Sequence, residues 1–130
     1  MLLDASAVMA LLLDETGAQR TLDVISKQPC FMSSVNLTEI EGKLVGRGEF
    51  TSAQVRSALI PLLALVTELP FDLTCREAAA FYYARKAPYG LSLGDAACLG
   101  TAEAHQLGVL TAEQRWATIP DLPFKIQVIR

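Results

Sequence analysis

The chain has 130 residues, close to the commonest domain size, so we expect a single domain over residues 1–130 with a hydrophobic core that needs no disulfide or metal to stabilise it. Hydrophobic residues make up 52% of the sequence and charged residues 19%, which excludes a mainly disordered chain. The formal net charge of −3 counts against a protein that holds nucleic acid through a broadly basic surface, but less against an enzyme that binds divalent cations in an acidic cleft.

Short apolar runs alternate with helical patterns in the first half of the chain. Met1–Leu3 is predicted to be a short strand, because its apolar run stops at Asp4. Cys30–Met32 is predicted to be a second, buried strand, since Pro29 ends the helix before it. The predicted helices are Ala5–Leu13, which ends before Gly17, then Ala18–Lys27, and a third that begins at Ser33-Ser34 and ends around Gly46–Gly48.

The second half continues this alternation of strands and helices. The predicted strands are Val66–Leu69, Val109–Thr111 and Ile126–Ile129. The predicted helices run from Thr51-Ser52 to about Leu65, from Thr74 to about Ala87, from Ser92 to about Gln106, and over the short turn Ala112–Trp116. Pro61 is expected to bend or divide the first of these helices. Strands alternating with helices imply parallel crossovers, so we expect a three-layer α/β/α fold with a short-stranded, mainly parallel central sheet.

Cysteine usage and hydropathy indicate where the protein works. The three cysteines, Cys30, Cys75 and Cys98, are far apart and only one histidine accompanies them, so neither a zinc site nor a disulfide framework is expected. Buried thiols are typical of a reducing cytoplasm. No signal peptide is predicted, because an acid stands at position 4, and no apolar run is long enough to span a bilayer. The protein is therefore predicted to be cytoplasmic, with no membrane partner.

Four acidic residues occupy comparable places in the predicted fold. Asp4 directly follows the first strand, and Glu113 follows the Val109–Thr111 strand by two residues. Glu39 lies in the second turn of the helix after the second strand, and Asp95 lies in the first turn of a later helix. Because ligand sites of open parallel sheets gather at the carboxyl ends of the strands, we expect these four carboxylates to meet there.

Each acid also has an ordinary structural explanation. Asp4 can cap the helix that follows it, and the fourth acid can favour the start of a short helix through the helix dipole. Glu39 stands four residues before Lys43, the spacing of a solvated ion pair on a helix. Asp95 stands three residues after Ser92, which is the spacing of a capping box. Taken singly, each acid fits its structural role better than a functional one.

Taken together, the four carboxylates indicate a metal site. Carboxylates brought close together repel one another, which raises their pKa values and destabilises the fold unless a cation neutralises them. Mg²⁺ or Mn²⁺ suits such a group, because these ions prefer oxygen ligands and keep several waters. A bound ion can orient and deprotonate water and can stabilise charge on a phosphate, so neither a side-chain nucleophile nor a histidine base is required.

Four segments resemble the motifs of the PIN domain family, and in particular those of the VapC-type toxins of bacterial toxin–antitoxin pairs. The four segments are Leu2-Leu3-Asp4-Ala5-Ser6-Ala7, Ser33-Ser34-Val35-Asn36-Leu37-Thr38-Glu39, Leu91-Ser92-Leu93-Gly94-Asp95-Ala96-Ala97 and Val109-Leu110-Thr111-Ala112-Glu113-Gln114-Arg115-Trp116. The third segment is the most distinctive, and the first alone would be weak. The resemblance covers essentially the whole chain, with the motifs in order and suitably spaced.

This resemblance implies a Mg²⁺- or Mn²⁺-dependent endoribonuclease with a single PIN-like α/β/α domain. It also implies an RNA substrate, a cognate antitoxin and a second copy of the chain as partners, the last forming a homodimer. The family's fourth motif more usually has aspartate where this chain has glutamate, whose extra methylene can weaken a second metal site. The acids carried over as catalytic and metal-binding are Asp4, Glu39 and Asp95, with Glu113 as a less certain fourth, and the supporting hydroxyls are those of Ser6 and Thr111.

Other residues are candidates for contacts with RNA or with partners. Aromatic side chains can stack on unpaired bases, although at helical spacing they more often belong to a core or an interface. Most of the basic residues are equally well explained as solvated surface charges. The Ala- and Leu-rich helices near the start and over Thr51–Leu65 are candidate partner surfaces, unless they pack wholly within the domain. The candidates for RNA contact are Lys43, Arg47, Arg85, Lys86 and Arg115 among basic residues and Tyr82, Tyr83 and Tyr89 among aromatic ones.

Two other functions stay open at this point. A PIN-like module that binds RNA or protein without catalysis would explain glutamate rather than aspartate at position 113. A receiver-type phosphoacceptor domain also places acids at strand ends, but it requires paired acids at the first strand and a lysine after a late strand. Here Leu3 precedes Asp4, and Ala112-Glu113 follows the late strand.

Overall fold

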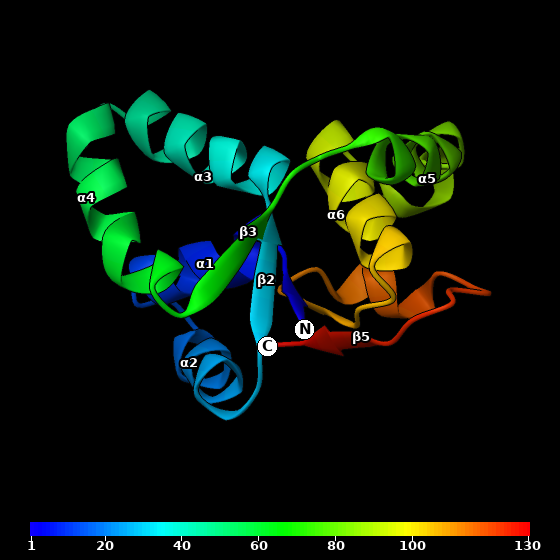
Figure 1. The fold of residues 1–130 in the computed structure, drawn as a ribbon, viewed down its shortest axis with the longest axis horizontal. Coiled ribbons are helices and arrows are strands. Elements are labelled where there is room, and N and C mark those ends of the chain that lie inside the picture. Colours follow the sequence, from blue (N-terminus) through cyan, green and yellow to red (C-terminus); the bar gives the residue numbers. More distant parts are fainter.

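A five-stranded sheet lies at the centre of the computed structural model, which describes residues 1–130 (Figure 1). Its strand order is β3-β2-β1-β4-β5, and every neighbouring pair is parallel. The strands are β1 (Leu2–Leu3), β2 (Cys30–Ser33), β3 (Val66–Leu69), β4 (Val109–Thr111) and β5 (Ile126–Val128). All five predicted strands are present, and their bounds agree with the prediction to within one residue.

Helices cover both faces of this sheet. One layer comprises α1 (Ala5–Leu12), α2 (Ala18–Lys27), α3 (Ser34–Gly46) and α4 (Ser52–Leu63), and the opposite layer comprises α5 (Leu73–Ala84) and α6 (Leu93–Ala104) (Figure 1). Two 3₁₀ helices, η1 (Ala87–Tyr89) and η2 (Gln114–Thr118), follow α5 and β4. The predicted three-layer α/β/α architecture is therefore confirmed. No helix has the length and apolar character that crossing a membrane requires.

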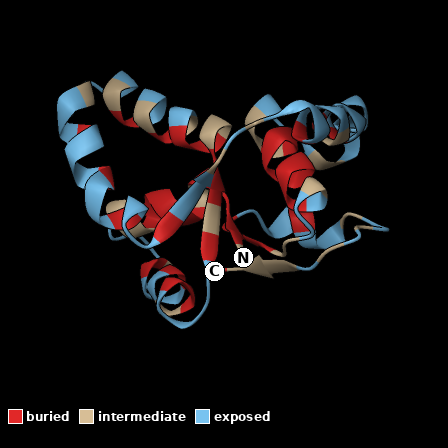
Figure 2. Ribbon diagram, in the orientation of Figure 1, coloured by how far each residue is buried: buried red, intermediate tan, exposed pale blue.

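Residues of the central strands alternate between two apolar cores, as the two-residue period of a strand requires. Leu3 and Leu110 pack with α1 to α4, whereas Leu2 and Val109 pack with α5, α6 and Trp116. These four aliphatic side chains are completely buried. Figure 2 shows the buried residues along the strands and on the inner sides of the helices. The strands β1 and β4 are thus packed against helices on both faces of the sheet, which fixes the position of their ends.

The order of the strands reverses between β1 and β4. The chain moves outward from β1 to β2 and β3, and it then returns through α5 and α6 to the other side of β1. At such a reversal, the loops after the two strands diverge and leave a crevice where ligands bind. Asp4 follows β1 at this place, and its N–H donates to the carbonyl oxygen of Leu110 in β4 at 2.9 Å.

Helix ends differ from the prediction where turns override the helical pattern. α5 ends at Ala84, and the predicted extension to about Ala87 is replaced by the separate turn η1, which contains Pro88. α6 ends at Ala104, because Gln106 adopts a φ of 53°, outside the helical region. Pro61 does not divide α4. It lies in the last turn, and the helix continues through it to Leu63.

The turn after β4 also begins later than predicted. The helical segment is Gln114–Thr118 rather than Ala112–Trp116. The reason is that the N–H of Ala112 donates to the Ser6 hydroxyl at 2.9 Å and the N–H of Glu113 donates to the Thr111 hydroxyl at 3.0 Å. These two backbone groups belong to a polar network around the end of the sheet, and the helix starts only after it.

Candidate functional site

Asp4 is the buried centre of this polar network, with 2% of its surface exposed. It is the N-cap of α1, and its Oδ2 accepts hydrogen bonds from the Ser6 N–H at 3.2 Å, from the Ser6 hydroxyl and from the Thr111 hydroxyl at 3.0 Å. No protein group donates to its Oδ1. The capping role predicted for Asp4 therefore uses one carboxylate oxygen and leaves the other without a hydrogen bond.

Ser6 and Thr111 connect the ends of β1 and β4. Their hydroxyl oxygens lie 3.2 Å apart, and each also accepts a hydrogen bond from the backbone after β4. Both side chains are thus fixed by donors on one side and by Asp4 on the other. The two hydroxyls expected near the acids lie beside Asp4, and they orient its carboxylate.

Asp95 lies at the N-terminus of α6. Its backbone N–H donates to the Ser92 hydroxyl at 3.1 Å, and its Oδ2 accepts the Ser92 N–H at 2.8 Å, so the predicted capping box is formed. No protein group donates to Oδ1 of Asp95. The side chain thus resembles that of Asp4, because one oxygen has a structural partner and the other has none.

Glu39 lies where α3 meets α6, and its surroundings are more complex. Asn36 donates to Glu39 Oε2 at 3.2 Å and to the carbonyl oxygen of Gly94 at 3.1 Å. A Cβ atom on Gly94 would lie 2.7 Å from Oε2, so a larger residue there would displace the flexible end of the Glu39 side chain. Lys43 Nζ lies 2.6 Å from Oε1, which forms the ion pair expected from the spacing of four residues. Both oxygens of Glu39 therefore have partners.

The pKa of Asp4 reflects its burial. The pKa is raised from 3.8 to about 6: removal from water is the main cause, the charge of Asp95 adds to the rise, and the hydrogen bonds from Ser6 and Thr111 oppose it. The protein thus holds a carboxylate in a place where its ionised form is unfavourable. A neighbouring cation would relieve that cost.

Two further groups show that three of the acids share one neighbourhood. Burial raises the pKa of the Cys98 thiol, and the charges of Asp4, Asp95 and Glu39 raise it further. The pKa of Lys43 is raised by its hydrogen bond to Glu39, and the charges of all three acids contribute to this rise. Asp4, Glu39 and Asp95 therefore lie near enough to one another for their charges to act on the same two groups.

Glu113 joins this group only through its backbone. Its N–H donates to the Thr111 hydroxyl, whereas its exposed carboxylate forms no hydrogen bond and no ion pair. It is not among the charges that shift the pKa of Asp4, Cys98 or Lys43. The fourth predicted acid is thus at the expected strand end but is not coupled to the other three.

The donor set fits a hard cation that keeps part of its water shell. No three His, Cys, Asp or Glu side chains lie close enough together to hold one ion directly, and both oxygens of Glu39 are engaged, by Lys43 and Asn36. Three oxygens without a hydrogen-bond donor remain: Oδ1 of Asp4, Oδ1 of Asp95 and the buried Oδ1 of Asn36. Mg²⁺ characteristically combines a few such oxygens with several waters.

Asn36 is a site residue that the sequence analysis missed. It is completely buried and joins Glu39 to the N-terminal turn of α6. The signal that identifies it is its spacing of three from Glu39, which places the two side chains on one side of α3. Lys43, a candidate for RNA contact, is instead paired with Glu39. The remaining cationic candidates, Arg47, Arg85, Lys86 and Arg115, form no ion pair with an acid.

The chain is similar to proteins of known fold. The family model of the PIN domain matches residues 1–122. No protein with a curated function matches the sequence. Among solved structures, VapBC2 from Rickettsia felis bound to a fragment of its promoter DNA is similar, with a TM-score of 0.73 and 17% identity over 98% of this chain and 96% of that chain.

Two further structures show the same fold. A toxin–antitoxin complex from Klebsiella pneumoniae has a TM-score of 0.66 and 22% identity, covering 96% of this chain and 98% of that chain. VapC20 from Mycobacterium tuberculosis, a toxin that cleaves the sarcin-ricin loop, has a TM-score of 0.68 and 19% identity, covering 90% of this chain and 93% of that chain.

Proposed function

The chain belongs to the PIN domain family, and from this we propose that it is a Mg²⁺- or Mn²⁺-dependent endoribonuclease, the toxin of a VapC-type toxin–antitoxin pair. The observation that carries the proposal is the coupled group of Asp4, Glu39 and Asp95 at the reversal of strand order. The similar folds of toxin–antitoxin complexes and of an RNA-cleaving toxin support it.

In this proposal the acids divide the work. Asp4 and Asp95 hold the principal ion, directly or through water, with the oxygens that accept no protein hydrogen bond. Glu39 completes the site or positions the attacking water, for which it must release Lys43. Glu113 assists a second ion. When bound, the cation supplies positive charge that favours deprotonated water and stabilises the negative charge of the phosphate.

The remaining chemistry is hydrolysis of a phosphodiester. The oxygen of water forms a bond to phosphorus, and the bond from phosphorus to the 3′ oxygen breaks. The leaving oxygen takes up a proton, so the products carry a 5′-phosphate and a 3′-hydroxyl. Ser6 and Thr111 contribute by fixing Oδ2 of Asp4, which keeps the carboxylate in one orientation throughout.

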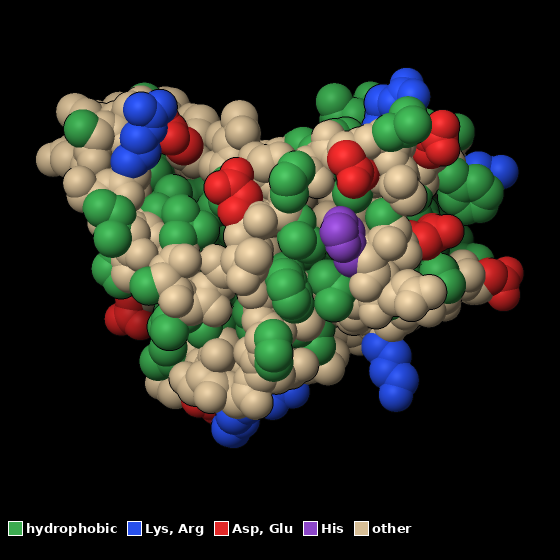
Figure 3. All heavy atoms as spheres, in the orientation of Figure 1, with side chains coloured by type: hydrophobic (Ala, Val, Ile, Leu, Met, Phe, Trp, Pro, Cys, Tyr) green, Lys and Arg blue, Asp and Glu red, His purple; other side chains and the backbone are tan.

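Binding of RNA requires a cationic surface, and the face of the molecule seen in Figure 3 has no cluster of Lys and Arg side chains at its centre. In Figure 3, Lys and Arg side chains lie at the margins of the view, while Asp and Glu side chains lie across its upper half. The unpaired cations Arg85, Lys86 and Arg115 lie instead at the end of α5 and in η2. We assign RNA contact to these residues.

The proposal includes two protein partners, an antitoxin and a second copy of the chain. A groove of about 260 Å³ between the end of α1 and α4 is lined almost wholly by apolar side chains, among them Leu12, Leu13, Phe50 and Val55. We assign this groove to the antitoxin. The predicted partner surface on α1 is reduced to the end of the helix, because its first two turns are largely buried.

A second candidate function is an RNA- or protein-binding module without catalysis. The observation that favours it is that both oxygens of Glu39 are engaged and that no three acidic side chains form a ready metal site. Under this alternative the Lys43 ammonium permanently replaces the cation. The two functions differ in whether a divalent ion binds near Asp4 and whether RNA is cut.

The test is cleavage of a mixed pool of structured RNA with Mg²⁺, with Mn²⁺ and with EDTA, using the wild-type protein and the Asp95→Asn variant. We expect cleavage at discrete sites with a divalent ion, none with EDTA and a loss of at least about a hundredfold in the variant. Asp95→Asn keeps an oxygen that can accept the Ser92 N–H, so the variant is expected to fold.

A matched control is Glu77→Gln, which changes an exposed acid of the neighbouring helix α5 that lines neither the acidic site nor a pocket. It should cleave as the wild type does. Metal binding, followed by thermal stability with and without Mn²⁺, gives a readout besides activity. Stabilisation by Mn²⁺ without cleavage of any RNA would favour the binding module, and cleavage that persists in EDTA would refute the metal-dependent mechanism.

A further inference from the structure

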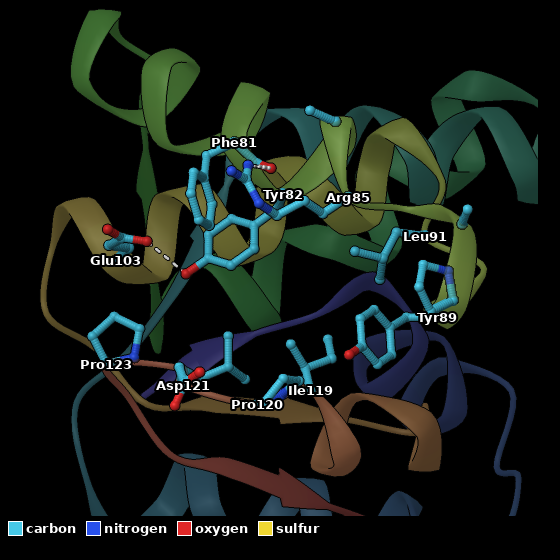
Figure 4. Close-up of a pocket in the computed structure, with 14 residues that line it drawn as sticks. Phe81, Tyr82, Arg85, Tyr89, Leu91, Glu103, Ile119, Pro120, Asp121 and Pro123 are labelled. Atoms are coloured by element: carbon cyan, nitrogen blue, oxygen red, sulfur yellow. Dashed lines mark hydrogen bonds between the residues drawn. The ribbon is translucent and has the colours of Figure 1, made fainter.

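A pocket of about 720 Å³ lies between the C-terminal half of α5 and the segment 119–123. None of Asp4, Glu39, Asp95 and Glu113 lines it, so it is separate from the acidic site. Figure 4 shows the ring of Tyr82 on one side of the opening and Ile119 and Pro120 on the other. The side chain of Tyr89 closes one end. The pocket is therefore a slot between a ring and a prolyl surface, suited to a flat, largely apolar group.

The polar groups of this slot are few. The Tyr82 hydroxyl donates a short hydrogen bond to Glu103, which engages that carboxylate, and burial and the same contact raise the pKa of Tyr82 far above its usual value. Tyr82 thus stays a neutral ring with its hydroxyl occupied. Asp121 also lines the slot, and it forms no ion pair. It provides a free acceptor at the edge of the pocket.

Unpaired cations surround the same slot. The guanidinium of Arg85 lies 3.6 Å from the centre of the Phe81 ring and donates to the Phe81 carbonyl oxygen, with no acid as partner. Lys86 lies 4.2 Å from the centre of the Tyr83 ring. Stacking holds both cations in place without neutralising them. Of these two cations only Arg85 lines the slot, and Glu103 and Asp121 line it as well, so its positive charge is confined to one rim, where a phosphate can be contacted.

The slot is joined to the acidic site through two residues. Leu91 lines the slot and precedes Ser92, whose N–H donates to Asp95 at 2.8 Å. Arg115 follows Glu113 by two residues, and its Nη1 would lie 3.5 Å from a Cβ on Gly90, in the turn beside the slot. The guanidinium of Arg115 thus lies beside the turn that leads from the slot through Leu91 to Ser92 and Asp95.

We propose that the slot binds one unpaired nucleobase of the RNA, close to the phosphodiester that is cut, with Arg85 and Arg115 contacting the flanking phosphates. The proposal rests on the RNA substrate of the proposed function. A base has flat apolar faces that match Tyr89 and Pro120, with the buried Tyr82 ring forming the floor beneath them, and its edge carries N–H groups from which Asp121 can accept hydrogen bonds. Unpaired bases in RNA complexes stack on aromatic rings in this way, and the stacking tolerates different sequences.

The experiment measures binding separately from cleavage. Single-stranded RNA hexamers carrying a fluorophore are titrated against the Asp95→Asn protein in EDTA, where no cleavage is expected. In this background Tyr89→Ala and Arg85→Ala should each weaken binding about tenfold, and Tyr89→Phe should restore it. Arg85→Ala should also reduce the slope of log affinity against log salt by about one. The matched control is Arg76→Ala, an exposed cation on the other half of α5, which should alter neither quantity.

Nuclear magnetic resonance locates the contact. The four nucleoside 5′-monophosphates, compared with inorganic phosphate, should shift the signals of Tyr89, Ile119 and Asp121, whereas phosphate alone should not. Unchanged hexamer affinity in Tyr89→Ala, or shifts caused equally by phosphate, would overturn the proposal. The proposal would also be overturned if no nucleotide shifted these signals but a protein partner did.

Cleavage assays distinguish failure of the slot from failure of the nuclease. In the otherwise wild-type protein, Arg85→Ala and Tyr89→Ala should raise KM about tenfold and leave kcat within about twofold. If the wild type cuts RNA but these variants keep its KM, the slot proposal fails and the nuclease stands. If the wild type cuts no RNA while the variants still weaken hexamer binding, the nuclease fails and the slot stands.

Discussion

Asp4 makes the stability of the metal-free protein depend on pH. Its pKa is raised from 3.8 to about 6 by burial and by Asp95. Below pH 3.8, the pKa of an unperturbed aspartate, the carboxyl is protonated in both the folded and the unfolded chain, so its burial does not lower the free energy of unfolding. Between the two values the unfolded chain loses its proton first, which lowers the free energy of unfolding as the pH rises. Above the higher value the full cost, about 3 kcal/mol, is present.

We therefore predict that Asp4→Asn stabilises the metal-free protein at pH 7.5 by up to about 3 kcal/mol, and much less at pH 4. The asparagine oxygen can accept the bonds from Ser6 and Thr111, so the network survives. Urea denaturation in EDTA at both pH values measures this. Asp72→Asn is the control, because the hydrogen bond from the Cys75 N–H lowers the pKa of Asp72 and the sign is opposite. A benefit of Asp4→Asn that is equal at both pH values would contradict the explanation.

At this scale the sequence predicted what depends on neighbours along the chain. The cap at Asp4, the capping box of Asp95 with Ser92 and the pair of Glu39 with Lys43 all follow from spacing, and all are present. The structure shows that these local roles and the coupled group exist together, because each aspartate uses only one oxygen for its cap. The burial of Asn36 was not predictable, since it depends on where α6 crosses α3.

At the scale of elements, α5 and α6 approach most closely at one glycine. A Cβ on Gly100 would lie 2.4 Å from the backbone nitrogen of Ala79 and 2.6 Å from its Cα. Backbone atoms cannot move away as a flexible side chain can, so the helices would have to separate. Separation would disturb the N-terminal turn of α6, which holds Asp95.

Gly100→Ala is accordingly predicted to destabilise the fold by about 1–3 kcal/mol, although alanine is the better helix former. The control is Gly42→Ala in α3, where a Cβ meets nothing within 4 Å and a gain of up to about 1 kcal/mol is expected. Thermal denaturation of both variants beside the wild type provides the comparison. If Gly100→Ala stabilised the protein as Gly42→Ala does, the helices would not be in the close contact described.

Helix and strand positions were largely predictable, while their exact ends were not. Alternating apolar runs located every strand, because a buried strand must be apolar whatever its neighbours are. Pro61 shows the limit, since its effect depends on whether it lies within a helix or in its last turn. The start of η2 depends on hydroxyls more than 100 residues away in sequence from one another, Ser6 and Thr111.

For the whole molecule, exposed leucines indicate where a second copy would bind. Leu73 and Leu93 begin α5 and α6, and 60% and 64% of their surfaces are exposed. Both lie at helix N-termini, and Leu93 is in the same helical turn as Asp95. Ile60, 68% exposed, is instead on α4, whose groove we assign to the antitoxin.

We predict that Leu73→Glu combined with Leu93→Glu shifts the proposed homodimer toward monomer at least tenfold in Kd, because each protomer would bring two charges into the interface. Light scattering after size-exclusion chromatography over a range of concentrations measures the change. Ile60→Glu, which leaves both leucines unchanged, should keep the dimer. The opposite pattern would place the second copy on α4.

The order of the strands was the part of the architecture that the sequence analysis left open. It predicted parallel crossovers and acids at strand ends, but not that β1 lies centrally between β2 and β4. Pairing between distant segments is decided by the fit of whole layers, and no local pattern records it. The partners of Asp4 across the sheet were therefore found only in the structure.

The position of β4 beside β1 has a consequence for a chain that is still being made. Asp4, Glu39 and Asp95 all leave the ribosome before Thr111 does. Until that residue has emerged and paired, Asp4 lacks one of its two hydroxyl donors, and β1 has a neighbour on only one side. A nascent chain thus already contains Asp4, Glu39 and Asp95 before β4 has paired with β1 to fix their positions. If the chain is the nuclease proposed above, the order of synthesis would keep it inactive beside the RNA of the ribosome that makes it.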